Sequence, residues 1–232
     1  MRLLLPLLAL LLAWPAAALE LMPTTLQLPA EAGHAELWLH NPGPDRWQGQ
    51  VRILAWEQQP DAELLRPSDQ ILASPTQLDL APGARQRIWL LPRQPTPVAG
   101  EQAYRIVLVP GQPGLPRYSL PLFRGQPAPM AQPRLHARIE LDPSQPILRL
   151  NNTGTVHARL HDLSFITGDG RRSLLLPGLA GYILPGHERR WALPARTQGY
   201  TGGRFLARLQ DGREVELAVP DPAIAASGAA GL

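Results

Sequence analysis

The chain has 232 residues, of which 20 are glycine and 27 are proline. Proline inside a helix costs about 3 kcal/mol, so this composition disfavours a helical bundle and favours short strands. A hydrophobic fraction of 44% with 18% charged residues excludes an intrinsically disordered chain. The formal net charge of +3 is too small to indicate nucleic-acid binding.

The residue types that are missing exclude much catalytic chemistry. All 22 basic residues are arginine, because the sequence contains no lysine, and it contains no cysteine. Schiff-base lysines, P-loop lysines, thiol nucleophiles, disulfides and cysteine-ligated zinc are therefore excluded. No serine lies in a Gly-x-Ser-x-Gly sequence, and no glycine-rich phosphate loop follows a predicted strand. We expect a protein that is not an enzyme and needs no cofactor.

The first 18 residues have the order of a secretory signal peptide. Met1-Arg2 is a short positive start, residues 3–14 form an almost unbroken apolar run, and Ala16-Ala17-Ala18 supplies the small residues that signal peptidase accepts. The alternative is a retained membrane anchor, but the run is shorter than the ~20 residues that span a bilayer. Removing 18 residues leaves 232 − 18 = 214, enough for two sandwich domains of about 107 residues each.

Residues 19–124 are predicted to form a first immunoglobulin-like domain. Short runs of alternating apolar and polar residues are separated by turn signals such as Asn41-Pro42-Gly43-Pro44 and Ala81-Pro82-Gly83. Roughly seven short strands in a hundred residues are typical of this sandwich, and no long stretch has the helical period. The predicted strands are 19–28, 35–40, 51–56, 71–73, 77–80, 86–91, 103–109 and a last one within 115–123.

A proline-rich linker at 125–133 separates this domain from a second β domain at 134–220. Three prolines in these nine residues make the linker semi-rigid. Strands are predicted at 134–141, 147–150, 156–166, 190–193, 204–209 and 214–219. The tail at 221–232 is small and apolar, and we expect it to be disordered. The predicted fold class is all-β, with two immunoglobulin-like β-sandwich domains.

Two histidines are the candidates for a metal site. His157 and His161 are four residues apart, a spacing that suits a metal on a helix. On a strand the two residues share a face but lie ~13 Å apart, which is too far for one ion. We therefore predict no metal site.

The segment 115–123 carries a candidate interaction site. Tyr118, Leu120 and Leu122 share one side of the predicted strand, and Pro121 lacks an N–H, which places the strand at a sheet edge. An apolar row on an edge strand favours a partner that covers it, although a last strand packed into its own core fits the pattern equally well. Arg105, on the neighbouring strand, is either a solvated charge or a group that grips a carboxylate in a cleft.

Eleven short motifs follow one another through almost the whole mature chain. They are Asn41-Pro42-Gly43, Ile53 to Gln58 with Trp56, Leu65-Arg66-Pro67-Ser68, Ser74-Pro75, Leu80-Ala81-Pro82-Gly83 with Gln86, Glu101 with Tyr104-Arg105, Ser119-Leu120-Pro121-Leu122-Phe123, Asn152-Thr153-Gly154 with His157, Gly181-Tyr182, Leu184-Pro185-Gly186 and Arg190-Trp191. Each motif is weak alone. In this order they resemble the periplasmic chaperones of chaperone–usher pilus assembly, and within them the archaic, spore-coat-U-like branch.

The resemblance implies two immunoglobulin-like domains set in an L, with a cleft that binds a fimbrial subunit. It implies an edge strand that completes an unfinished pilin sandwich until an outer-membrane usher receives the subunit. The donor residues are then Tyr118, Leu120 and Leu122, with Phe123 ending the row. It further implies a periplasmic location, no membrane-embedded part and no nucleic-acid partner. We also hypothesise that the unliganded chain caps itself as a dimer.

The cations that hold the subunit in this family are only partly matched. Many members anchor the C-terminal carboxylate of the subunit with an arginine on the first strand and a lysine on the last strand of domain one. Thr25 stands at the first position, and the chain has no lysine for the second. Arg105 is our first substitute and Arg117 the second, while the Thr25 hydroxyl could donate a hydrogen bond. The alternative for Arg105 is an ordinary ion pair across the sheet or between domains.

The alternative function is a secreted two-domain β-sandwich module, such as an adhesin or a pilin-like subunit. A subunit should carry an extendable donor strand near its mature N-terminus. Residues 19–28 alternate poorly and are interrupted by Pro23, which disfavours that function. An exported hydrolase is a third class, which the missing serine or cysteine site disfavours.

Overall fold

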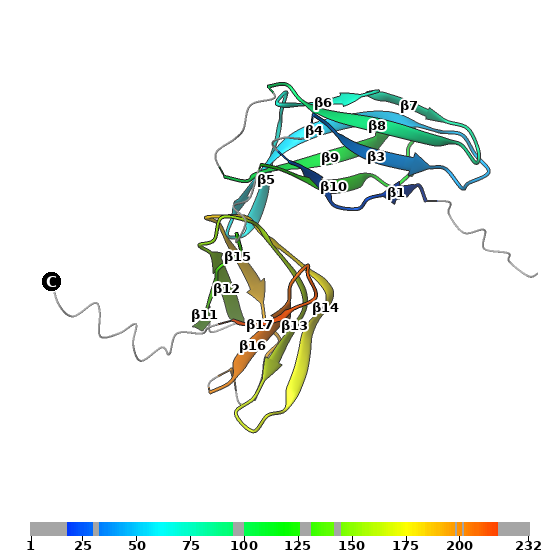
Figure 1. The fold of residues 1–232 in the computed structure, drawn as a ribbon. Helices are drawn as coiled ribbons and strands as arrows, with labels where there is room; N and C mark the ends of the chain where they lie inside the picture. Colours follow the sequence, from blue (N-terminus) through cyan, green and yellow to red (C-terminus); the bar gives the residue numbers. More distant parts are fainter. Residues whose placement is uncertain are drawn as a thin grey trace, which may run out of the picture.

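The computed structural model describes residues 18–29, 33–94, 100–125, 131–141, 145–197, 199–200 and 202–217. All regular elements in these residues are β-strands, which confirms the predicted all-β class. Figure 1 shows two sandwich domains joined at an angle, as the resemblance implied. The predicted signal peptide up to residue 17, residues 126–130 of the predicted linker and the predicted tail lie outside the described residues. Within the described residues, no helix is long and apolar enough to cross a membrane.

Domain 1 is a sandwich of two sheets. One sheet has the strand order β1-β3-β8-β6, and the other has the order β2-β10-β9-β4-β5, with β7 also paired to β4. All pairs are antiparallel except β2 with β10. The strands are β1 (Glu20–Met22), β2 (Leu26–Leu28), β3 (Ala35–His40), β4 (Trp47–Gln59), β5 (Ala62–Pro67), β6 (Ile71–Ser74), β7 (Gln77–Leu80), β8 (Arg85–Pro92), β9 (Gln102–Pro110) and β10 (Tyr118–Arg124).

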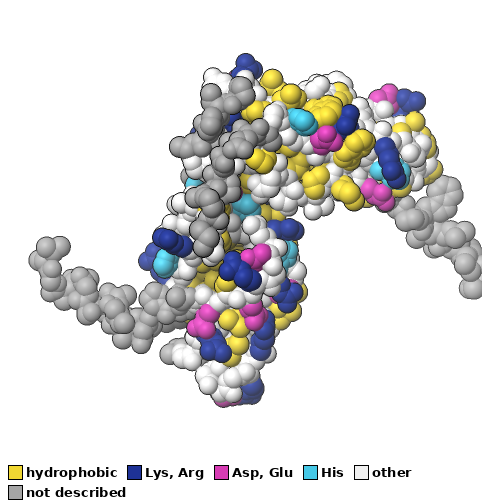
Figure 2. Space-filling model, viewed as in Figure 1, with side chains coloured by type: hydrophobic (Ala, Val, Ile, Leu, Met, Phe, Trp, Pro, Cys, Tyr) yellow, Lys and Arg dark blue, Asp and Glu magenta, His cyan; other side chains and the backbone are white. Residues whose placement is uncertain are grey.

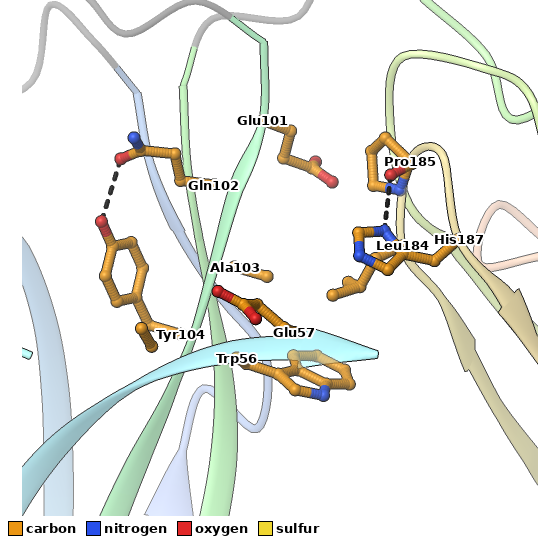
Figure 3. Close-up of a pocket in the computed structure, with 10 residues that line it drawn as sticks. Trp56, Glu57, Glu101, Gln102, Ala103, Tyr104, Leu184, Pro185 and His187 are labelled. Carbon is orange, nitrogen blue, oxygen red and sulfur yellow. Dashed lines mark hydrogen bonds between the residues drawn. The ribbon is translucent and has the colours of Figure 1, made fainter. Parts of the chain in front are cut away.

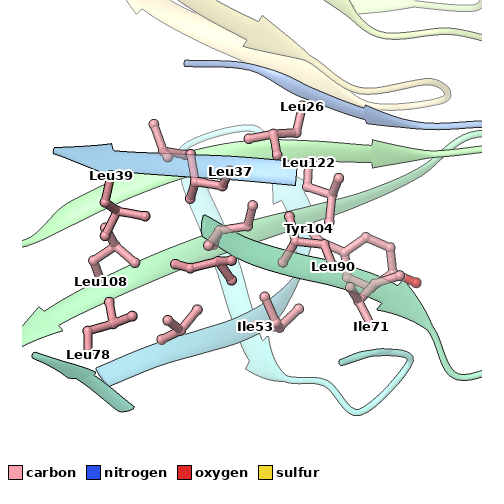
Figure 4. Packing of buried hydrophobic residues seen from close by; sticks show 14 of the residues in the cluster. Leu26, Leu37, Leu39, Ile53, Ile71, Leu78, Leu90, Tyr104, Leu108 and Leu122 are labelled. Carbon is pink, nitrogen blue, oxygen red and sulfur yellow. The ribbon is translucent and has the colours of Figure 1, made fainter. Parts of the chain in front are cut away.

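The core of domain 1 follows from the alternation along its strands. Leu37 and Leu39 of β3 face Ile106 and Leu108 of β9, and all four side chains are fully buried. Figure 4 shows Leu37, Leu39 and Leu108 among the buried side chains packed between the two sheets. Each fully buried aliphatic side chain contributes about 1.5–3 kcal/mol, so this layer holds the two sheets together.

Strands β4 and β5 are longer than the sequence pattern predicts, and they lead to domain 2. β4 extends past the predicted end at Trp56 to Gln59, and β5 was not predicted because its side chains are mostly exposed. In Figure 1 the ends of both strands reach the second domain. This hairpin carries several of the interdomain contacts described below.

Domain 2 is a smaller sandwich of two sheets. One sheet has the order β11-β12-β15, and the other has the order β14-β13-β16-β17. Its core includes Leu148, Leu160, Phe165 and Phe205, all almost fully buried. The strands are β11 (Leu135–Leu141), β12 (Pro146–Asn152), β13 (Ala158–Ile166), β14 (Arg172–Ile183), β15 (Glu188–Ala192), β16 (Arg204–Arg208) and β17 (Glu214–Leu217). The strands thus fall on either side of the predicted linker, and the domain boundaries themselves stay predictions.

Strand β14 was missed by the sequence analysis. Its pairing with β13 is broken by three register shifts, and Gly178 has a positive φ of 70°. The Gly178 N–H donates to Asp162 Oδ1 over 2.8 Å, which holds the irregular part of the hairpin in place. Such bulges interrupt the period of two that reveals a strand in a sequence.

The two domains repeat one hydrogen-bonded corner. The buried Asn41 side chain donates to the carbonyls of Leu80 and Asp45 and accepts the N–H of Gly43. The Gly83 N–H in turn donates to the Asn41 carbonyl over 2.7 Å, which ties the corner to the Ala81-Pro82-Gly83 turn.

Asn152 makes the same set of bonds in domain 2. Its side chain donates to the carbonyls of Ile183 and Val156 and accepts the N–H of Gly154, while Gly186 donates to its carbonyl. A Cβ at Gly154 would lie 2.4 Å from the Gln132 carbonyl oxygen, so the turn requires glycine. Two of the motifs that carry the family resemblance are therefore structural corners.

The outer face of the sheet β1-β3-β8-β6 carries two tryptophans beside an arginine. The guanidinium carbon of Arg87 lies 4.0 Å from the ring centroid of Trp89 and 5.2 Å from that of Trp38, and Arg87 also pairs with Glu36. In Figure 2 hydrophobic side chains gather on domain 1 among charged ones. The exposed large apolar side chains of this face are Met22, Trp38, Leu72 and Leu91.

We predict that Asn152→Ala lowers the free energy of unfolding by about 1–3 kcal/mol, because two buried carbonyls lose their donor. Asn151→Ala, at the neighbouring and partly exposed position, should have a much smaller effect. Urea unfolding followed by circular dichroism would measure both. Equal losses in the two variants would contradict the structural role of the corner.

Candidate functional site

The site lies where the two domains meet, around a cluster of aromatic side chains. Trp56 of β4 and Phe123 of β10 pack against Tyr182 and Leu184 of domain 2, and all four are at most 6% exposed. The Trp56 and Tyr182 rings are 5.6 Å apart in an edge-on arrangement. Because aromatic pairs add about 0.5–1.5 kcal/mol beyond area burial, this cluster fixes the angle between the domains.

The side-chain amide of Gln58 joins the domains through two hydrogen bonds to the backbone of domain 2. Its side-chain Nε2 donates to the Tyr182 carbonyl over 2.9 Å, and its Oε1 accepts the Leu184 N–H over 2.8 Å. The amide thus takes the place of a backbone peptide beside β14. A buried side chain with both groups satisfied has one favoured position, so Gln58 sets the register of the interface.

A second interdomain contact joins Glu101 and His157. The His157 backbone N–H donates to Glu101 Oε1 over 2.8 Å, and His157 Nδ1 lies 3.0 Å from both carboxylate oxygens. The imidazole also stacks on Phe123, with 3.5 Å between centroids. His157 therefore contacts a carboxylate and an aromatic ring of domain 1. Within the described residues no cluster of three histidine or acidic side chains could hold a metal ion.

The tip of the β4–β5 hairpin docks on β15. The Arg190 N–H donates to the Pro60 carbonyl over 3.1 Å, and the Arg190 guanidinium bonds to Asp61 over 3.0 Å. The hairpin thus spans both domains and brings β5 beside Arg105.

Arg105 of β9 extends across the Trp56 ring at the domain boundary, and we call the surroundings of its guanidinium the arginine cleft. Its guanidinium carbon lies 3.7 Å from the Trp56 centroid, and Nη2 lies 3.2 Å from Glu63 Oε2. The side chain is only 12% exposed. Burial lowers the pKa of Arg105 from its usual value, and the Glu63 carboxylate offsets part of that shift. The guanidinium is thus held in a largely desolvated, aromatic-walled place.

Two further arginines, from domain 2, contact groups that Arg105 also contacts. The Arg159 guanidinium carbon lies 5.9 Å from the Tyr182 centroid, nearly the 5.8 Å of Arg105, and Arg189 lies 4.0 Å from Glu63. Within the described residues the buried Nε atoms of Arg105 and Arg159 have no hydrogen-bond partner. Two of these guanidiniums, those of Arg105 and Arg189, thus share the Glu63 carboxylate. Arg159 and Arg189 were not among the predicted site residues, because nothing in their local sequence distinguishes them from solvated charges.

The structure brings Thr25 to this place but not Arg117. Thr25 Oγ1 lies 3.4 Å from the Tyr182 hydroxyl, so Thr25 and Arg105 both reach Tyr182. Arg117 is exposed just before β10. It lies four residues from Pro121, the partner of Arg105 in the ladder, which is about 13 Å along the strand.

The predicted donor residues of β10 face inward. Leu120 and Leu122 are 8% and 0% exposed in the core of domain 1, and Tyr118 packs against that core. Phe123 lies in the interdomain cluster instead. In this conformation these side chains fill the chain's own core, the alternative that the sequence left open. Their contact with a subunit stays a prediction.

The backbone of β10 is only partly paired on its outer side. All seven residues pair with β9, but β2 covers only Leu122 to Arg124. Among the described residues, no strand covers Tyr118 to Pro121 on that side. This half of β10 is a free sheet edge, as Pro121 predicted.

A shallow pocket of about 270 Å³ lies on the same interface, and Trp56 lines it. Figure 3 shows Glu57 and Glu101 on the domain 1 side, with Leu184 and His187 opposite. His187 Nδ1 lies 2.7 Å from the Pro185 carbonyl oxygen. Two acidic side chains make this pocket unsuited to an anion, in contrast to the arginine cleft.

Comparisons with known proteins identify the fold. No protein-family model and no curated protein matches the sequence. The chain is similar to the archaic chaperone CsuC from the CsuC–CsuE chaperone–tip adhesion subunit pre-assembly complex of Acinetobacter baumannii, with a TM-score of 0.70 and 21% identity over 88% of this chain and 100% of that chain. It is also similar to the YadV chaperone, with a TM-score of 0.63 and 15% identity over 85% and 96% of the two chains.

A third similar structure is that of the Salmonella enterica SafA pilin in complex with the SafB chaperone, with a TM-score of 0.58 and 14% identity over 88% and 97% of the two chains. The chain has the fold of the chaperone–usher pilus chaperones, including the archaic branch. The predicted resemblance is confirmed at the level of the fold.

We predict that Gln58→Leu uncouples the two domains, because the Tyr182 carbonyl and the Leu184 N–H lose their partner at a cost of about 1–3 kcal/mol. Scanning calorimetry should then resolve separate transitions for the domains, and small-angle scattering should show a broader range of interdomain angles. Gln59→Leu, at the next and exposed position of β4, is the control. An unchanged calorimetric profile for Gln58→Leu would show that Gln58 does not couple the domains.

Proposed function

We propose that this chain is a periplasmic chaperone that binds incomplete fimbrial subunits and delivers them to an outer-membrane usher. The observation that carries the proposal is the free edge of β10 beside an arginine-lined cleft, within the fold of pilus chaperones. Such a protein acts by binding alone, so it requires neither a catalytic group nor a cofactor.

The free edge suits donor-strand complementation. Backbone groups of Tyr118 to Pro121 can form a ladder with a subunit, and main-chain bonds tolerate many subunit sequences. The inward side chains hold β10 against the core, so the subunit meets the backbone and the outward Ser119. Covering this edge also removes an aggregation hazard, which is why a self-capped dimer is part of the proposal for the unliganded chain.

The cleft suits the C-terminal carboxylate of a subunit. Arg105 and Arg159 reach the Tyr182 ring from different domains, and each has a buried Nε that no group of the described residues hydrogen-bonds. Planar guanidiniums bind carboxylates through paired hydrogen bonds, which are stronger where water is excluded. Thr25, beside the Tyr182 hydroxyl, adds a further donor. We propose Arg105 as the main anchor, with Arg159 as its partner in place of the absent lysine.

The alternative function, a secreted adhesin or pilin-like module, makes a different prediction. Such a module would not change the yield of the subunits encoded beside it. Co-expression of the full chain with those subunits in a periplasm, followed by pull-down and native mass spectrometry, separates the two. If the chain is a chaperone, it should form a stoichiometric complex with a subunit. Free subunits should be degraded only when the chain is absent.

In that assay we expect Arg105→Gln to reduce recovered subunit at least about tenfold, because a desolvated charge pair with the carboxylate is lost. Arg87→Gln is a matched control, since Arg87 is also stacked on tryptophan and paired with a glutamate, but on the outer face. Equal loss of subunit in both variants, or loss that tracks the melting temperature, would contradict an anchoring role for Arg105.

We also expect Ser119→Asp to abolish capture without lowering the melting temperature. Ser119 is exposed between Leu120 and Tyr118, so the variant keeps the core but places a charge where an apolar subunit groove would close. Ser74→Asp, an exposed serine on β6, controls for added charge on an edge strand. Full capture by Ser119→Asp would show that the subunit binds elsewhere. Leu120→Asp is unsuitable, because it would disrupt the core itself.

A further inference from the structure

Glu63 already occupies the centre of the arginine cleft. It lies on β5, the edge strand of the hairpin that spans both domains, directly opposite Gln58 in the ladder. Because paired residues of antiparallel strands share a face, Glu63 points toward domain 2, as Gln58 does. The carboxylate is thus delivered to the cleft by the same hairpin that fixes the domain angle.

The contacts of Glu63 are those of a bridging carboxylate. Both of its oxygens lie within 3.4 Å of Arg105 Nη2, at 3.2 and 3.4 Å, and Arg189 Nη1 lies 4.0 Å from Oε1. Arg105 comes from domain 1 and Arg189 from domain 2. Glu63 therefore makes with two guanidiniums the contacts that a carboxylate ligand would make.

The two sides of this contact differ in exposure. The Arg105 side chain is 12% exposed and lies against Trp56, whereas Glu63 is 34% exposed on an edge strand. Arg105 is therefore fixed by packing, while Glu63 can turn into solvent and be rehydrated at little cost. The cation site is preorganised, and its present anion is the part that can leave.

We propose that Glu63 is an internal competitor for the carboxylate site, which an incoming carboxylate must displace. In the free chain Glu63 reduces the repulsion between Arg105 and Arg189. On binding, the carboxylate of the ligand takes the place of Glu63 between the two arginines, and Glu63 moves into water. The net free energy of binding is then the difference between the interactions that the two carboxylates make with these arginines. An exchange of this kind keeps binding reversible, which suits a protein that must pass its ligand on.

The inference rests on the proposed function only for the origin of the carboxylate in a subunit. The exchange itself is a property of the free chain and can be tested without a subunit. Acetate is the probe, with acetamide as its neutral analogue and chloride at equal ionic strength as the control for screening. Arginine Nε–Hε signals in NMR spectra, with that of Arg105 assigned from Arg105→Lys, report binding.

We expect Glu63→Gln to raise the affinity for acetate about tenfold over the unmodified chain and to leave acetamide without effect. Glu63→Asp should raise it as well, because the shorter side chain keeps the charge but falls short of Arg105. The control is Glu57→Gln, on β4 of the same hairpin, which removes an equal charge outside the cleft. Melting temperatures verify that each variant is folded.

Three outcomes would overturn the inference. These are an unchanged or lower acetate affinity in Glu63→Gln, an equal rise in Glu57→Gln, and no shift of the Arg105 signal in any variant. The proposed function fails separately, when the unmodified chain captures no subunit in the co-expression assay, and the anchoring role of Arg105 fails when Arg105→Gln captures subunits as well as the unmodified chain does. If Glu63→Gln binds acetate more strongly while Arg105→Gln captures subunits normally, Glu63 does compete for the carboxylate site, but Arg105 does not anchor the subunit.

Discussion

The stacking of Arg105 on Trp56 is the contact on which the arrangement of this molecule depends. The indole receives the guanidinium at 3.7 Å and packs against Tyr182 of the other domain, 5.6 Å away. One side chain thus belongs at once to the cation site and to the interdomain cluster. A change in the domain angle would move Tyr182 and Arg159 relative to Arg105, and would dissolve the site without altering any of its residues. Rigidity between the domains is therefore a condition of binding and not only of stability.

That rigidity comes from a long strand pair rather than from a large interface. β4 runs through domain 1 and continues to Gln59, so Trp56 and Gln58 are held by the ladder of domain 1 while they contact domain 2. Polar contacts then add to the aromatic ones, because Gln58 satisfies both backbone groups beside it. A buried polar contact of this kind contributes little net stability, but it accepts a single register, and a cleft needs that specificity.

The sequence predicted the scaffold better than the site, for a physical reason. Turn signals and alternation located most strands within one or two residues, and β3 and β7 at both ends, because these patterns are local. β5 and β14 were missed because one is exposed on both faces and the other is broken by bulges. Those two strands carry Glu63 and Tyr182. The site is formed by residues more than 40 positions apart, such as Arg105 and Glu63, and no local pattern records such a pairing.

The absence of lysine is consistent with how this cleft is built. An ammonium is a strongly hydrated point charge, whereas a guanidinium is planar and more weakly hydrated, and keeps donors free when one of its faces is covered. A cation buried against Trp56 with 12% exposure therefore suits arginine, because stacking replaces part of the lost hydration while Nη2 still reaches Glu63. Arg87 shows the same combination of tryptophan and glutamate on the outer face. Arg105 differs from Arg87 in its position, because it lies between two domains and near a further guanidinium, that of Arg189. A second carboxylate that binds there can interact favourably with more than one positive charge.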